Sequence, residues 1–272
     1  MLYGMGVDLA HLRGTEVGVE GGVAEAIELS VVVPCFNEAK GIADLVLDLE
    51  QEFLELGEPF EVIVVDDRST DDTPRLLDEL AQGREWLHVH HAEQNAGHGP
   101  SVIRGLELSR GQWIFQIDSD RQFVVSEFAD LWERRYDADL VLGVRADRDD
   151  PLHRIVLSRT VSLVVSALAL RRLRDPNVPF RIYRRELWED LRQFMGPKTL
   201  APSIFVTLGA VSRGWRLVEV PVTHLRGTRE VSTLRKWRLV KFSLSGLLEL
   251  AVYRFRLARH GRAAVVIARE TA

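Results

Sequence analysis

The chain has 272 residues, of which 46% are hydrophobic and 28% charged, so it is long enough to build a large core as one large or two small domains. Its one cysteine, Cys35, excludes a disulfide within the chain and suits a reducing compartment. We see no basic start followed by an apolar stretch and no apolar run of about 18 residues, so we expect neither a signal peptide nor a transmembrane helix.

The net charge of −5 is distributed unevenly. Between His224 and Arg262, ten Lys or Arg residues face two Glu residues, a local balance of +8 that leaves −13 for the remainder. A basic segment with interleaved apolar residues favours an anionic membrane surface as partner, and a basic helix packed on the acidic body is the alternative. Nucleic acid finds little support, because the body is acidic and no aromatic stacking platform accompanies the arginines.

The chain begins with a Gly-rich, weakly patterned segment at residues 1–28, which predicts an irregular leader. The β-branched run Leu29–Val33, closed by Pro34, predicts a buried strand. Apolar residues then recur with a helical period through Ala39–Leu56.

Strands and helices continue to alternate up to residue 117. The predicted elements are a strand at Val62–Val65 stopped by Asp66 and Asp67, a helix from Pro74, a strand at Leu87–His91, a Gly-rich loop entering a helix at 95–111, and a strand at Trp113–Ile117. Such alternation predicts βαβ units on a parallel sheet, whose ligands bind at the carboxyl ends of the strands.

The second half of the chain is read in the same way. It predicts a strand at Asp139–Val144, a long apolar helix around Val161–Leu170, a strand entering a helix at 180–187, a strand at 216–224, and an amphipathic helix at Ser232–Arg259 broken near Gly246. The ten-residue run Val161–Leu170 is too short to span a bilayer. We expect it to pack on the sheet, with a place in the membrane interface as the alternative.

The stretch QIDSDRQF (116–123) places polar side chains at one strand end. Asp118, Asp120 and Gln122 alternate along it, and alternate residues of an extended segment face the same side. They therefore converge on one small, hard cation, or they form a plain acidic turn. Several predicted strands end in polar residues at the same edge, among them Asn37 and Glu38, which favours the metal site.

Ordered motifs from about Leu29 to Lys241 resemble the family 2 glycosyltransferases of the GT-A fold, most closely the polyprenyl-phosphate (dolichyl-phosphate) hexosyltransferases. VVVPCFNE is similar to VVxPxxNE, VVDDRSTDDT to VDDxSxDxT, NAGHGPSVIRG to NxGxGxAxxxG with Ser101 in place of Ala, and QIDSDRQF to DADxQ. Further on, LGVR is similar to GxR, RIVLS to Arg-x-x-x-Ser, DPNVPFRIYRRE to DxxxGFRxxRRE with departures at Val178 and Pro179, and VPVTHLRG to the stretch before the Arg-x-Gly segment.

The resemblance implies an α/β GT-A domain at 29–225, with a mainly parallel sheet flanked by helices, followed by a basic amphipathic helical segment at 226–272. It also implies a nucleotide-sugar donor and Mg²⁺ or Mn²⁺ held by Asp118, Asp120 and Gln122, with Asp120 the principal ligand. The implied nucleotide-sugar site comprises Pro34, Phe36, Glu38, Asp67, Ser101, Asp118, Ser119, Asp120, Arg145 and Arg226. For Asp67 a helix-capping turn, and for Phe36 ordinary loop packing, remain the alternatives.

The candidate residues for binding the acceptor are mainly basic. Arg145, Arg154, Ser158 and Arg181 are the candidates for an acceptor phosphate, although an arginine taken alone is more often an ordinary surface residue. Asp175 is the candidate base if the acceptor is a hydroxyl, and His224 is either a phosphate contact or a structural histidine. Asp118, Asp120 and Asp175 are thus the expected catalytic residues.

The function we expect is that of an inverting hexosyltransferase, acting from a GDP-mannose or UDP-glucose type donor onto polyprenyl phosphate at the cytoplasmic membrane face. The chain would be peripheral there, and a membrane-protein partner is a further candidate. Two alternatives stay open: transfer to a soluble saccharide or other small acceptor, and a non-catalytic nucleotide-sugar-binding or scaffold protein.

Overall fold

The structure, a computed structural model, describes residues 26–146, 152–225 and 236–260. Within them seven strands form one sheet in the order β3-β2-β1-β4-β6-β5-β7. The strands are β1 (Leu29–Cys35), β2 (Phe60–Asp66), β3 (Leu87–His91), β4 (Trp113–Gln116), β5 (Leu140–Arg145), β6 (Arg181–Arg184) and β7 (Leu217–Val222). Only β6 of these seven runs against its neighbours, β4 and β5, so the expected mainly parallel sheet is confirmed.

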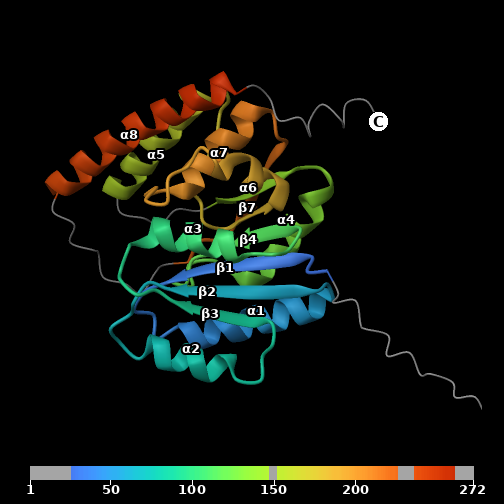
Figure 1. Cartoon of the computed structure of the whole chain (residues 1–272). Coiled ribbons are helices and arrows are strands. Elements are labelled where there is room, and N and C mark those ends of the chain that lie inside the picture. The colour runs from blue at the N-terminus through green and yellow to red at the C-terminus, as the bar shows by residue number, and fades with distance from the viewer. Residues whose placement is uncertain (1–25, 147–151, 226–235, 261–272) are drawn as a thin grey trace, which may run out of the picture.

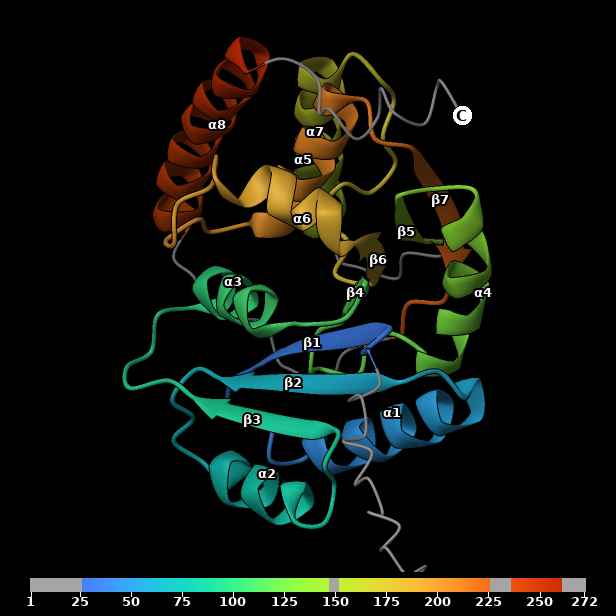
Figure 2. The ribbon, with the colours of Figure 1, turned by 45° about the vertical axis from the view of Figure 1, so that its right-hand side comes forward.

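Helices cover both faces of the sheet (Figures 1 and 2). The helices of the described residues are α1 (Ile42–Leu56), α2 (Thr73–Ala81), α3 (His98–Leu108), α4 (Phe128–Glu133), α5 (Leu152–Ala169), α6 (Arg185–Arg192), α7 (Pro202–Arg213) and α8 (Lys236–Arg259), with short 3-10 turns at Val125–Glu127 and Arg134–Tyr136. Of these, α5 and α8 pack mainly on α7, so the long apolar helix expected to pack on the sheet lies in an outer layer. Right-handed crossovers from β1 out to β3 place α1 and α2 on one face, and the return from β3 to β4 places α3 on the other.

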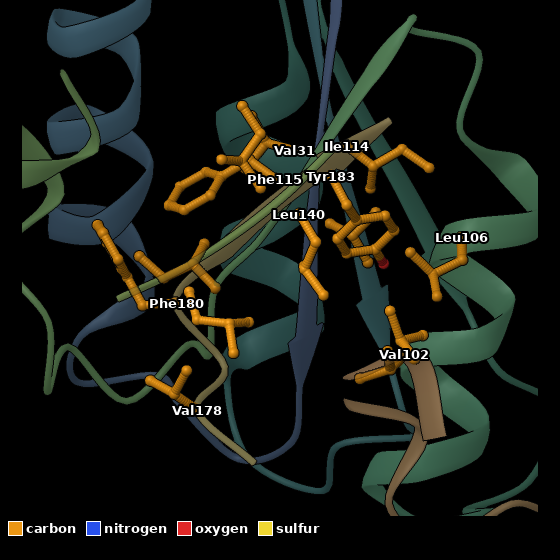
Figure 3. Packing of buried hydrophobic residues seen from close by; sticks show 14 of the residues in the cluster. Val31, Val102, Leu106, Ile114, Phe115, Leu140, Val178, Phe180 and Tyr183 are labelled. Carbon is orange, nitrogen blue, oxygen red and sulfur yellow. The ribbon is translucent and has the colours of Figure 1, made fainter. Parts of the chain in front are cut away.

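The core fills the space between the sheet and these helices (Figure 3). Neighbouring residues of β4 point to opposite faces, as the pleat requires. Phe115 contacts Phe180 on the α1 side, with ring centroids 5.0 Å apart, whereas Ile114 lies on the α3 side near Leu106. Both faces of the strand are therefore apolar, which explains why the sequence of β4 lacks a polar alternation until its end.

Two expectations about element boundaries are corrected. Pro34 does not close the first strand but lies within β1, where it is aligned with Val65 of β2. Helix α8 is not broken near Gly246 and runs through it. The cost of one glycine in a helix, about 1 kcal/mol, is offset by the anchoring of α8 through buried Leu250, Tyr253 and Leu257.

Helix α8 packs on α7, with the rings of Phe205 and Tyr253 4.9 Å apart. One side of the basic C-terminal helix is thus attached to the body. Residues 1–25 of the expected leader (1–28) and residues 226–235 and 261–272 of the C-terminal segment lie outside the described residues, and residues 26–28 form no helix or strand. Among the helices described, none combines the length and apolar content needed to cross a membrane.

A buried carboxylate closes the amino-terminal edge of the sheet, away from the motifs. Glu61 of β2 accepts hydrogen bonds from Ser30 Oγ at 2.6 Å and from Nη2 and the backbone amide of Arg110 at 2.6 and 2.7 Å. Burial alone raises the pKa of Glu61, but these hydrogen bonds prevail and hold its pKa below the ordinary value. The network joins β1, β2 and the turn before β4.

Candidate active site

The motif residues gather where the order of the strands reverses. Strand β1 has β2 on one side and β4 on the other, and α1, which leads from β1 to β2, lies on the opposite face from α3, which leads into β4. In open α/β sheets a crevice forms outside the carboxyl ends of the strands at such a point. The loop after β1 and the QIDSDRQF segment after β4 both open into it.

The loop after β1 is held by hydrogen bonds to the loop after β2. Ser69 Oγ accepts from the backbone amide of Asn37 at 2.8 Å, Thr73 Oγ1 accepts from the amide of Glu38 at 2.8 Å, and Asn37 Oδ1 accepts from the amide of Thr70 at 2.7 Å. Asn37 has a φ of 54°, an uncommon backbone conformation for a residue with a side chain. Ser69, Thr70 and Thr73 of VVDDRSTDDT thus fix the shape of PCFNE.

Asp67 positions the Gly-rich loop. Its two carboxylate oxygens accept hydrogen bonds from the backbone amides of Ala96 and Gly97, both at 2.8 Å, and its side chain is buried. This differs from the helix-capping turn considered as its alternative role. Asp67 also lines the smaller of the two cavities described below.

The three predicted metal ligands lie together. Asp118, Asp120 and Gln122 line one cavity, and the Gln122 amide donates to the Asp120 carboxylate. Arg121 between them has a φ of 55° and points away, to Asp44 of α1 at 2.6 Å. This reversal of the backbone lets the flanking polar side chains face the crevice.

His98, the first residue of α3, joins this group without having been singled out by its motif. Its Nε2 lies 2.9 Å from Oδ1 of Asp118. Partial burial lowers the pKa of His98, but the charges of Asp118 and Asp120 prevail and raise it above the ordinary 6.5. The spacing of NAGHG gave no signal for this contact, because the contact depends on how α3 packs on β1 and β2.

Two cavities meet at these residues. The smaller, about 280 Å³, is lined by Pro34, Cys35, Phe36, Glu38, Asp67, Asn95, Gly97, His98, Ser101, Asp118, Ser119 and Asp120. The larger, about 480 Å³, is lined by His98, Asp118, Asp120, Gln122, Phe123, Arg145, Asn177, Pro179, Leu200, Ala201, Pro202, Ser203 and His224. His98, Asp118 and Asp120 belong to both, so a ligand that spans the two cavities must pass these three side chains.

Arg145 lines the larger cavity and is held by Asp175. Nε and Nη2 of Arg145 donate to the two oxygens of Asp175 at 2.7 and 3.1 Å, and Asp175 is fully buried. Asp175 is not among the residues lining either cavity. This geometry makes it a positioning residue for Arg145 and does not support the expected role of base.

Arg181 does not support an acceptor-phosphate role either. It is fully buried, and its guanidinium donates to the backbone oxygen of Ser203 at 2.7 Å and to Oγ1 of Thr207 at 2.9 Å, as well as to oxygens of Val178 and Pro176. Burial lowers its pKa to about 10. The side chain connects β6 to α7, which a motif cannot indicate.

The remaining predicted residues divide in three ways. Pro34, Phe36, Glu38, Ser101 and Ser119 all line the smaller cavity. Ser158 lies on α5 and lines neither cavity. Arg226 and the side chain of Arg154 lie outside what the structure describes.

Two further residues reach the larger cavity from distant parts of the chain. An isolated antiparallel bridge pairs Phe123 with His224, and the amide of Leu225 donates to the carbonyl of Gln122 at 2.8 Å. This pairing brings His224 to Asp120 and Gln122. Asn177 enters from the segment before β6.

The family model for glycosyl transferase family 2 matches residues 30–197, which include this whole set of loops up to α6. The chain belongs to this family. The glycosyltransferase AglD of Haloferax volcanii is 31% identical over 233 residues, covering 82% of this chain and 37% of AglD.

A second relative is the undecaprenyl-phosphate 4-deoxy-4-formamido-L-arabinose transferase of Pseudomonas aeruginosa, 33% identical over 177 residues. That match covers 64% of this chain and 52% of the relative. The chain thus spans about a third to a half of the length of these curated relatives.

Solved structures of two other transferases share the GT-A fold. Glucosyl-3-phosphoglycerate synthase from Mycobacterium tuberculosis, in complex with Mn²⁺, UDP and phosphoglyceric acid, has a TM-score of 0.63 at 21% identity, covering 84% of this chain and 78% of that one. The mannosyltransferase PcManGT from Pyrobaculum calidifontis, in complex with GDP-Man and Mn²⁺, has a TM-score of 0.58 at 19% identity. The match covers 89% of this chain and 66% of the mannosyltransferase.

The donor atoms at the junction of the cavities fit a divalent cation. Two carboxylates, from Asp118 and Asp120, and the amide oxygen of Gln122 are the ligand types that Mg²⁺ and Mn²⁺ prefer. In the described part of the chain, no group of three His, Cys, Asp or Glu side chains is arranged to hold a metal ion by itself. The arrangement suits an ion that completes its coordination with water and substrate phosphate oxygens.

Proposed function

We propose that this glycosyltransferase moves a hexose from a nucleotide sugar of the GDP-mannose or UDP-glucose type to polyprenyl phosphate, with inversion, at the cytoplasmic face of the membrane. The observation that carries the proposal is the pair of cavities that meet at His98, Asp118 and Asp120. A nucleotide sugar has the same order of parts: a nucleoside, a diphosphate that needs charge compensation, and a sugar.

The smaller cavity would hold the nucleoside. Phe36 lines this cavity and is 39% exposed, and an aromatic ring in such a position offers an apolar surface for a base. Glu38 supplies a carboxylate that accepts from ring N–H or ribose hydroxyl groups. The preformed hydrogen bonds between the loops after β1 and β2 keep both residues in place, so little ordering is required on binding.

The diphosphate would lie at the junction. Asp118, Asp120 and Gln122 would hold a divalent cation there, which when bound compensates the charge of the diphosphate as it leaves. His98 stands at the first turn of α3, where backbone amides and the helix dipole favour an anion. Its imidazole, 2.9 Å from Asp118, places a ring nitrogen at the same point.

The larger cavity would receive the sugar and the acceptor phosphate. Arg145, fixed by Asp175, presents a cation to the acceptor phosphate. A phosphate monoester is largely ionised at neutral pH, with a second pKa of about 6. Its oxygen attacks the anomeric carbon as the bond from that carbon to the diphosphate oxygen breaks, and the electron pair leaves with the diphosphate. No strong base is needed for this step, in keeping with the buried position of Asp175.

The choice of acceptor is supported by the Pseudomonas relative, whose name states transfer to undecaprenyl phosphate. The peripheral membrane placement is supported by the basic C-terminal segment, with its local balance of +8. A membrane-protein partner at the same surface remains a further candidate.

The first test is a thermal-shift screen of GDP-mannose, UDP-glucose and UDP-N-acetylglucosamine with Mn²⁺, with Mg²⁺ and with neither. A ligand that binds only the folded state raises the melting temperature, so we expect a metal-dependent rise with one donor. Asp120→Ala should abolish that rise, and Asp72→Ala, at an exposed carboxylate on the neighbouring loop, should preserve it. No rise with any donor would contradict the transferase site.

The second test offers undecaprenyl phosphate and soluble acceptors to the protein with the donor found in the first. Labelled sugar in the lipid phase supports the proposal. Transfer only to a soluble saccharide or phosphate would overturn the lipid acceptor and keep the donor site.

A further inference from the structure

Helix α8 carries apolar side chains on two opposite faces. The face turned to the body consists of Leu250, Tyr253 and Leu257, which are at most 5% exposed. At 3.6 residues per turn these three positions fall on one side of the helix. They account for the packing of α8 on α7 and leave the other side to solvent.

The opposite side of α8 is apolar as well. Leu248, Val252 and Phe255 follow one another at spacings of four and three residues, which places them in one stripe. They are 68%, 44% and 62% exposed. A helix that only needs to cover its own protein has no reason to carry this second stripe, since a polar face is the usual choice towards water.

Helix α5 adds a second stripe in the same outer layer of the molecule (Figure 1). Val156 and Leu163 lie seven residues apart on α5, and Leu170 follows the end of the helix; they are 62%, 71% and 88% exposed. Arg254 of α8 donates to the carbonyl of Leu168 at 3.1 Å, which ties the two helices together. Half of the twelve large apolar side chains that are exposed in the described part of the chain belong to these two stripes.

A hollow of about 430 Å³ lies beside the α8 stripe. Leu248 and Val252 line it together with Phe194 and Phe205 from the segment before α7 and from α7 itself. Glu249 and Arg256 also line this hollow, which shares no lining residue with the two cavities of the active site.

Arginines accompany the apolar stripes. In the described part of α8 after Gly246, Arg254, Arg256 and Arg259 face a single acidic residue, Glu249. The guanidinium of Arg259 lies 5.3 Å from the ring centre of Phe255. From Val156 to Arg174 the chain has four arginines and no acidic residue, although the chain as a whole is acidic.

We propose that the outward face of α8, with the exposed stripe of α5, docks on an anionic lipid bilayer. Leu248, Val252 and Phe255 enter the boundary between headgroups and acyl chains, and the arginines contact lipid phosphates. The charge decides against a second copy of the chain, because a symmetric dimer through this face would set the basic surface against itself. The docking surface lies outside the substrate cavities and does not depend on the identity of the acceptor.

The test is co-sedimentation of the full chain with phosphatidylcholine vesicles that contain or lack phosphatidylglycerol, without any polyprenyl phosphate. We expect binding to the anionic vesicles, weakened by high salt. Phe255→Ser should lower the partition coefficient about tenfold, the order expected from losing one buried aromatic side chain. Leu54→Ser, at a 60% exposed position on α1, is the matched control and should bind as the parent does.

Failure of docking is distinguishable from failure of the catalytic proposal, since donor binding by thermal shift should be the same in Phe255→Ser and the parent. No binding of the parent to anionic vesicles would overturn the inference, and so would unchanged binding of a folded Phe255→Ser. A dimer seen by light scattering that dissociates in Phe255→Ser would also overturn it, by assigning the face to self-association. Arg256→Gln combined with Arg259→Gln should remove the preference for anionic over neutral vesicles. A double variant that keeps this preference would show that the two arginines do not contact the lipid phosphates.

Discussion

Gly99 in the first turn of α3 provides a sharp test of the site geometry. A Cβ atom at this position would lie 2.2 Å from the backbone oxygen of Thr199 and 2.8 Å from that of Leu200. Ordinary contacts of a Cβ atom begin at 3.4 Å. Gly99→Ala therefore forces α3 and the 199–200 segment apart by roughly 1 Å, because both obstacles are backbone atoms and cannot rotate away.

This movement affects the substrate cavities directly. His98 precedes Gly99 and belongs to both cavities, while Leu200 lines the larger one. Overpacking of this kind costs about 1–3 kcal/mol, or a fall in melting temperature of about 2–10 °C for a chain of this size. A displacement of about 1 Å at the reacting groups lowers the transfer rate on the order of a hundredfold.

The assay compares Gly99→Ala with Gly196→Ala, both measured by thermal unfolding and by donor titration calorimetry. Gly196 lies in the same connecting segment before α7, and a Cβ atom there meets nothing within 4 Å. We expect only Gly99→Ala to lose stability and donor affinity. Equal melting temperatures and equal affinities in the two variants would refute the close approach of α3 to residues 199–200.

Three further predictions concern charged and titratable groups. Asp175→Asn should destabilise the protein by about 3 kcal/mol in urea unfolding, because it breaks a buried ion pair and loosens Arg145; an unchanged midpoint would contradict this. Glu61 has a lowered pKa in the folded state, so its stabilisation is fully present above its ordinary pKa of 4.5 and is lost as the pH falls through the folded value. The stability gap between the parent and Glu61→Gln should therefore narrow below about pH 4.5, and a constant gap from pH 3 to 7 would count against the network. Burial raises the pKa of Cys35 to about 12, so a maleimide should leave the native protein unlabelled at neutral pH and label it once in denaturant, as read by mass spectrometry.

Much of the site was predictable because its signals are local. The apolar runs of β1, β2 and β4 and the polar residues that follow them are contiguous in sequence, and parallel strands align their carboxyl ends at one edge. Asp118, Asp120 and Gln122 alternate along eight residues, so their common cavity follows once the strand before them is recognised. The same local order made the family resemblance visible.

The sequence could not supply the partners that come from far along the chain. No residue near Asp175 in the sequence indicates that Asp175 forms an ion pair with Arg145, thirty residues away. Likewise, no residue near Arg181 indicates that Arg181 is buried against α7. His98 and His224 reach the cavity only because α3 packs on β1 and a bridge pairs Phe123 with His224.

The sequence by itself determined the alternation of strands and helices, the loops that carry the motifs and the basic, apolar composition of the last helix. Tertiary structure alone decided which of those polar groups are satisfied by the protein and which face a cavity. It also decided that α8 buries one apolar face and exposes the other. The physical reason is that periodicity fixes where a side chain lies around its own element, whereas burial depends on which other element arrives to cover it.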